Sequence, residues 1–149
     1  MRDILILVET ISGYFALFSC ALFAGAATYV SLVERPAIAK GGGHLANAYL
    51  LFSQPRPTIF QTSFAAIGGL GGILAGLAGS NPWWVAGGVI LSSAAMFNLW
   101  IIAPQSRSLK FDEDGFDPDL DQKLGQLSRL YGLQSIAGLG VLFIYIVKT

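Results

Sequence analysis

The chain has 149 residues, carries no net charge, and is 54% hydrophobic against 12% charged. A soluble domain has about a quarter of its residues charged, so this composition predicts a protein that lies in a lipid bilayer. The nine basic residues are scattered along the chain, which excludes the basic surface of a nucleic-acid-binding protein. Cys20 is the only cysteine, so the chain alone can form neither a disulfide nor a thiolate metal site.

Four apolar segments are long enough to cross the hydrocarbon layer, which takes about 20 residues of helix. We predict helices over residues 4–33, 59–79, 83–103 and 118–147, with the last helix in the membrane from about residue 130. A cleaved signal peptide is the less favoured interpretation of the first segment, because its apolar run is too long. The predicted fold is all-α, an integral membrane four-helix bundle that forms a single domain over residues 1–149.

The basic residues also predict how the bundle is oriented. Seven of the nine lie in the two longer connections, which join the first helix to the second and the third helix to the fourth. Cytoplasmic loops of membrane proteins are enriched in Lys and Arg. We therefore predict that both long loops are cytoplasmic and that both termini lie on the non-cytoplasmic side. The predicted location is a bacterial inner membrane or an equivalent cellular membrane.

The second and third helices carry clear local signals. Asn81 suits a helix N-cap and Pro82 suits the first helical position, where a missing N–H costs nothing. Gly68, Gly72 and Gly76 recur every four residues, a spacing that lets two helix backbones approach closely in lipid. Packing within the bundle is the favoured interpretation, and a homo-oligomer through this glycine-rich helix is the alternative.

Polar residues gather where all four helices reach the predicted cytoplasmic side. They can line a polar cup that binds a hydrophobic small molecule, or they can reach to lipid headgroups as ordinary helix-end residues do. Gln61 and Asn98 lie one or two turns inside the apolar spans, where a side-chain amide needs a hydrogen-bond partner. The predicted substrate-binding residues are Arg35, Gln61, Asn98, Gln105, Arg107, Tyr131 and Gln134.

Four segments resemble, in order, the helix landmarks of domain-of-unknown-function family 1772, the anthrone-oxygenase-like group of four-helix membrane proteins. They are "LFAGAATYVSLVERPA" (residues 22–37), "RPTIFQTSFAAIGGL" (56–70), "IIAPQSRSL" (101–109) and "RLYGLQSIAGL" (129–139). The resemblance covers nearly the whole chain and is strongest in the first segment. It implies a membrane four-helix bundle, and for fungal relatives the oxidation of an anthrone to an anthraquinone by dioxygen without a metal or flavin cofactor.

Several positions match the family pattern residue by residue. The Glu-x-Pro element after the first helix corresponds to Glu34 and Pro36. The Arg and Gln that lead into the second helix correspond to Arg56 and Gln61, and the Pro that closes the third helix corresponds to Pro104. The resemblance therefore implies that Glu34 and Arg56 are the candidate catalytic residues.

Other positions depart from the pattern. Ser106 replaces the Asn of the family's Pro-x-Asn, and Tyr131 and Gln134 replace the His and Arg of its fourth helix. If the reaction needs a base that removes a proton near neutral pH, the remaining candidates are Glu34 and His44. Arg56 or Arg35 would stabilise the resulting anion.

Two functions are thus predicted. In the first, the protein is a cofactor-independent oxygenase of a flat aromatic substrate, and no metal is expected. In the second, the bundle has lost its chemistry and serves as a non-catalytic membrane subunit that stabilises or recruits a larger membrane complex. The loss of the family's His and Arg favours the second function slightly.

Overall fold

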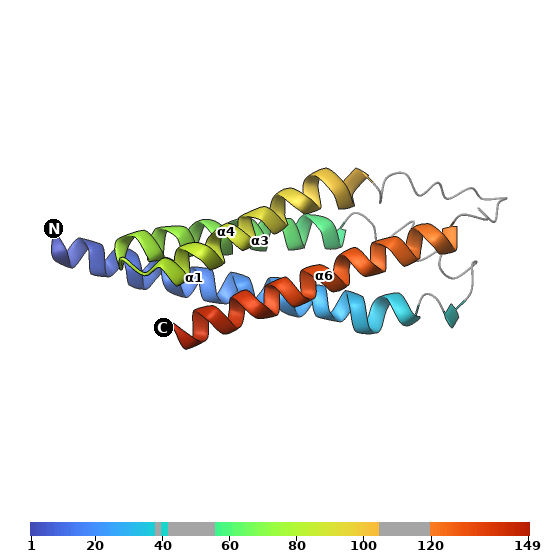
Figure 1. Cartoon of the computed structure of the whole chain (residues 1–149), viewed down its shortest axis with the longest axis horizontal. Helices are drawn as coiled ribbons and strands as arrows, with labels where there is room; N and C mark the ends of the chain where they lie inside the picture. The colour runs from blue at the N-terminus through green and yellow to red at the C-terminus, as the bar shows by residue number, and fades with distance from the viewer. Residues whose placement is uncertain (38–39, 42–55, 105–119) are drawn as a thin grey trace.

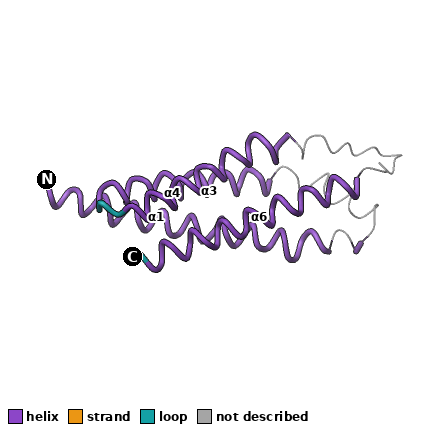
Figure 2. The backbone as a smooth tube through the Cα atoms, in the orientation of Figure 1, coloured by secondary structure: helices purple, strands orange, loops and turns teal. Residues whose placement is uncertain are grey.

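The computed structural model describes residues 1–37, 40–41, 56–104 and 120–149. In that part of the chain, four long helices lie side by side along a common axis (Figure 1), and no strand is present (Figure 2). They are α1 (Arg2–Tyr29), α3 (Arg56–Ala78), α4 (Pro82–Phe97) and α6 (Leu120–Val147). The all-α, four-helix prediction is confirmed.

Both termini lie at the same end of the bundle as the α3–α4 turn, which we name the terminal end (Figure 1). α3 and α6 begin at the opposite end, which we name the polar end. Each helix is long and apolar enough to cross a membrane. The side of the membrane that each end faces stays a prediction.

Large apolar side chains cover the outside of the bundle on all four helices. Phe18, Leu70, Trp100 and Ile136, one from each spanning helix, are all more than 60% exposed. Monomeric soluble proteins seldom show so much contiguous apolar surface. The surface therefore suits contact with lipid, as the composition predicts.

Glycines let the helices approach closely inside the bundle. A Cβ atom at Gly68 would lie 3.3 Å from the backbone nitrogen of Cys20 on α1, and one at Gly76 would lie 2.7 Å from the backbone nitrogen of Val85 on α4. Gly72 faces Tyr145 of α6. All three predicted glycines thus pack the chain against itself, and an oligomer through α3 stays a prediction.

The α3–α4 turn has the predicted cap. The Asn81 side chain accepts a hydrogen bond of 3.1 Å from the backbone N–H of Trp83, and Pro82 is the first residue of α4. Ser80, in the short turn between the two helices, has a positive φ of 54°, which lets the chain reverse direction there. This turn holds α3 and α4 antiparallel and in contact along their length.

Two helices contain a π-helical turn near the polar end. In η1 (Val30–Glu34) the chain continues directly from α1, and in η2 (Asn98–Ile102) it continues directly from α4. The N–H of Arg35 bonds to the carbonyl of Val30, and the N–H of Ala103 bonds to that of Asn98, each five residues back. The helical path is therefore wider at these two turns than in the rest of the bundle.

A proline follows each π turn at the same distance. Pro36 comes two residues after η1, and Pro104 comes two residues after η2. A proline ring in a regular α-helix clashes with the carbonyl four residues back, and the wider turn relieves that clash. Helical structure consequently continues through Pro36 to Ala37, whereas the sequence predicted that the first helix would end near residue 33.

Candidate functional site

The polar end contains a buried cation stacked on a buried ring. The Arg35 side chain is 5% exposed and its Cζ lies 5.1 Å from the centroid of the Tyr131 ring, which is fully buried. A guanidinium over an aromatic face gains a cation–π attraction. Within the described residues, however, none of the three guanidinium nitrogens has a hydrogen-bond partner. Burying a charged group without hydrogen-bond partners costs free energy, and an acceptor that binds the guanidinium would lower this cost.

The π turn of the first helix places an acid beside that cation. Glu34 is the last residue of η1 and is half-buried, with its Oε1 atom shielded from solvent. Ser31, also in η1, shares a hydrogen bond of 3.1 Å with Ser135 of α6. This contact holds η1 against the same face of α6 that carries Tyr131. A carboxylate and a buried cation thus occupy consecutive positions at the end of this turn.

The π turn of α4 contributes a second polar contact to the same face of α6. Gln134 Nε2 donates a hydrogen bond of 2.8 Å to the Oδ1 of Asn98, the first residue of η2. Both side chains are buried. Asn98 Nδ2 and Gln134 Oε1 remain without a partner among the described residues. The pair therefore keeps one donor and one acceptor for a further group.

Glu34, Arg35, Asn98 and Gln134 form a polar layer at this end of the bundle. Gln61 extends the polar layer onto α3, which packs against η2. Its side chain is fully buried, and neither its Oε1 nor its Nε2 finds a partner in the described part of the chain. Buried side-chain amides in native proteins are almost always hydrogen-bonded. Gln61 is thus a further group that a polar ligand would satisfy.

The structure brings together some of the residues that the sequence predicted for the site. It joins Arg35 to Tyr131 and Asn98 to Gln134, and it buries Gln61. Arg56 is the first residue of α3, and the structure describes the side chains of this helix only from Ile59 onward. The other predicted residues, Gln105, Arg107 and His44, lie outside the described residues.

A shallow groove on the outside of the bundle leads to this layer. It lies between α4 and α6, encloses about 190 Å³, and is almost entirely apolar. Leu133 on its wall is 59% exposed, whereas Gln134 in the same groove is 3% exposed and lies at its base. A hydrophobic molecule in the lipid phase can therefore approach the Asn98–Gln134 pair from the side.

Sequence reasoning missed Ser31, which shares one helix face with Glu34 and Arg35. The three residues stand at i, i+3 and i+4, the spacing of neighbours on a helix surface. Sequence reasoning also missed both π turns. The sequence does contain one signal, which is a proline at the end of the first and of the third apolar segment, Pro36 and Pro104. In the structure the helix continues through each of them.

A substitution of Gln61 tests whether its buried amide lacks hydrogen bonds. Gln61→Leu is expected to raise the free energy of unfolding by about 1–3 kcal/mol, because it removes a buried amide that has no hydrogen bond. Gln134→Leu is the matched control and is expected to lower it, because that change also leaves the Asn98 carbonyl oxygen without its donor. Unfolding in mixed micelles would measure both. Equal destabilisation by the two variants would contradict this description of Gln61.

The polar layer offers one acid, one buried cation and several amide groups at the end of an apolar bundle. Among the described side chains, no three His, Cys, Asp or Glu residues are close enough to share a metal ion. The groups present suit a ligand that is largely apolar and carries oxygen atoms at one edge. The chain matches no family model, no curated protein and no solved structure.

Proposed function

We propose that the protein is a cofactor-independent oxygenase that acts on a flat hydrophobic aromatic substrate at the polar end of the bundle. The observation that carries the proposal is the buried Arg35 guanidinium, stacked on Tyr131 beside Glu34 and lacking a hydrogen-bond acceptor in the described part of the chain. A substrate oxygen that becomes negatively charged during the reaction is the acceptor that this cation would take. The resemblance to the anthrone-oxygenase-like family supports the same chemistry.

In the proposed reaction, Glu34 removes a proton from the central CH₂ of an anthrone-type substrate. The electrons move onto the ring carbonyl oxygen, and Arg35 stabilises the resulting anion, as a fixed cation in a low-dielectric site does most effectively. This electron-rich anion is then oxidised by dioxygen. One oxygen atom becomes the second carbonyl of the quinone, and the other leaves as water with the two hydrogens of the CH₂ group.

The apolar bundle suits both reactants. A flat aromatic substrate partitions into lipid, and the groove between α4 and α6 opens toward that phase with Gln134 at its base. Dioxygen is also apolar and needs no dedicated channel through such a bundle. Gln61, Asn98 and Gln134 would bind the polar edge of the substrate, while Arg56 at the start of α3 stays a predicted second cation.

A non-catalytic membrane subunit is the second candidate. The observation in its favour is that the Ser31–Ser135 and Asn98–Gln134 contacts already join the helices to one another, as polar residues often do in membrane bundles. Tyr131 and Gln134 also occupy the positions of the family's His and Arg. Under this function the polar layer would fix the shape of the bundle and bind no substrate.

Turnover by the purified wild-type protein distinguishes the two. The protein in detergent or nanodiscs would be given an anthrone, and quinone formation would be followed by absorbance while an electrode records dioxygen. The oxygenase is expected to consume one dioxygen per quinone, and ¹⁸O₂ is expected to place one labelled oxygen in the quinone. Quinone formation no faster than in empty nanodiscs would overturn the proposal and favour the subunit.

A further inference from the structure

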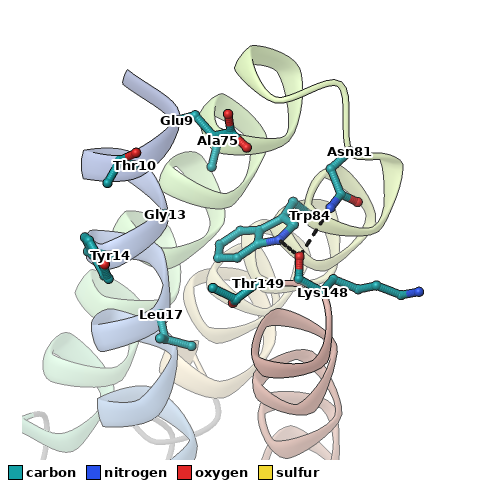
Figure 3. A pocket seen from close by; sticks show the side chains of 10 residues that line it. All are labelled: Glu9, Thr10, Gly13, Tyr14, Leu17, Ala75, Asn81, Trp84, Lys148 and Thr149. Atoms are coloured by element: carbon teal, nitrogen blue, oxygen red, sulfur yellow. Dashed lines mark hydrogen bonds between the residues drawn. The ribbon is translucent and has the colours of Figure 1, made fainter. Parts of the chain in front are cut away.

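A second cavity lies at the terminal end, on the opposite side of the bundle from the polar layer. It encloses about 290 Å³ between α1, the α3–α4 turn and the end of α6. Figure 3 shows Glu9, Thr10 and Tyr14 of α1 on one side, Lys148 on the other, and Trp84 between them. The proposed oxygenase chemistry uses none of these residues.

The wall of this pocket is held in place by hydrogen bonds. The Lys148 carbonyl accepts one from Trp84 Nε1 at 3.2 Å and one from Asn81 Nδ2 at 3.4 Å. Trp84 also stacks on Tyr145 at a centroid distance of 4.4 Å. Two hydrogen bonds and a stacked ring thus fix the end of α6 against the α3–α4 turn. The shape of the pocket wall is therefore set by specific contacts.

Among the side chains that line the pocket, one is acidic and one is basic. Glu9 projects from α1 against Gly79, where an added Cβ would collide with its carboxylate. Among the described residues no ion pair neutralises this carboxylate. The Lys148 ammonium is directed away from Glu9, at 5.2 Å from the centroid of the exposed Trp83 ring. A ligand that spans the pocket would therefore meet an anion on one side and a cation on the other.

The depth of the pocket matches the headgroup layer of a membrane. Glu9 stands beside the turn where α3 ends and α4 begins, which is where these spanning helices leave the hydrocarbon. Tyr14 and Trp83 are 68% and 52% exposed at the same end, and such rings are enriched at membrane interfaces. The molecules with two opposite charges at this depth are zwitterionic phospholipids.

We propose that this pocket binds the headgroup of a phospholipid with a primary ammonium, placing the ammonium at Glu9 and the phosphate at Lys148. The Glu9 carboxylate accepts hydrogen bonds from a primary ammonium. Thr10 Oγ1 donates to the Ile6 carbonyl at 2.8 Å and keeps its lone pairs as further acceptors. A primary ammonium has three N–H donors, whereas a quaternary ammonium has none to give to this carboxylate. Ethanolamine is therefore preferred to choline.

Lipid retention tests the proposal. The full chain would be delipidated, exchanged into nanodiscs with phosphatidylethanolamine or phosphatidylcholine of identical acyl chains, and analysed by native mass spectrometry. Wild type is expected to retain the ethanolamine lipid about tenfold better, the difference that one charge-assisted hydrogen bond gives. Glu9→Gln is expected to remove this preference. Asp3→Asn, which removes a carboxylate of the same helix outside the pocket, is expected to keep it.

Two further variants separate the roles of the charges. Lys148→Gln is expected to lower the retention of both lipids, because both carry the phosphate. Gly79→Ala keeps every charge but displaces the Glu9 carboxylate, so it is expected to lose the ethanolamine preference as Glu9→Gln does. Equal retention of the two lipids by wild type, or an unchanged preference in Glu9→Gln, would overturn the proposal.

Discussion

Glu34→Gln is expected to lower the rate of quinone formation by about 10²–10⁴-fold, the contribution of a positioned general base. The amide keeps the size and shape of the carboxylate, so η1 should hold its geometry. What the amide cannot do is accept the proton that leaves the substrate carbon. Initial rates from absorbance and dioxygen uptake, measured on the wild-type protein and the variant at equal protein concentration, would give the ratio.

Three other variants make that result specific. Arg35→Met is expected to lower the rate by about 10²–10³-fold, because it removes the cation that stabilises the developing anion. Arg56→Gln tests the second predicted cation at the start of α3. Asp3→Asn removes a carboxylate at the far end of the bundle and is expected to leave turnover unchanged. Full turnover in both Glu34→Gln and Arg56→Gln would show that the catalytic residues are assigned wrongly.

The sequence predicted the helices well because hydrophobic segments of membrane length are a strong signal. The four predicted spans and the four helices of the structure differ mainly at their ends, and the Asn81–Pro82 cap was predicted from local chemistry alone. The end of the first helix was harder. Proline usually stops a helix, and only the wider turn of η1 explains how Pro36 lies inside one.

The contacts within the site were less accessible to prediction. The sequence placed Arg35, Asn98, Tyr131 and Gln134 at one depth, since each lies near the end of an apolar span. It did not pair Arg35 with Tyr131, or Asn98 with Gln134, because the rotation of each helix about its axis sets those pairs. The two π turns change that rotation locally, and helical periodicity gives no sign of them.

The terminal pocket was missed for a related reason. In the sequence alone, Glu9 is an acid near the end of a long apolar segment, which by itself predicts only contact with headgroups. Its neighbours in the pocket, Trp84 and Lys148, come from segments more than seventy residues away in the chain. Only the packing of α1 against α3 and of α6 against the α3–α4 turn places them together.

Gly88→Ala is expected to lower the free energy of unfolding by about 3 kcal/mol or more, at or above the upper end of typical overpacking effects. A Cβ at this position would lie 2.6 Å from the carbonyl oxygen of Gly69 and 2.7 Å from the backbone nitrogen of Ile73, both on α3. Neither atom can rotate away as a side chain can. α3 and α4 would have to separate, and close van der Waals packing is a principal force that holds helices together in lipid.

Gly25→Ala is the matched control, because no atom lies within 4 Å of its added Cβ. Alanine favours the helix over glycine by about 1 kcal/mol, so this variant should be as stable as wild type or slightly more stable. Unfolding in mixed micelles, followed by helical circular dichroism, would measure both. Separating α3 from α4 would also move Gln61 on α3 away from η2, so Gly88→Ala should weaken ligand binding at the polar end while Gly25→Ala should not. Equal stability of the two variants would mean that α3 and α4 do not approach as closely as described.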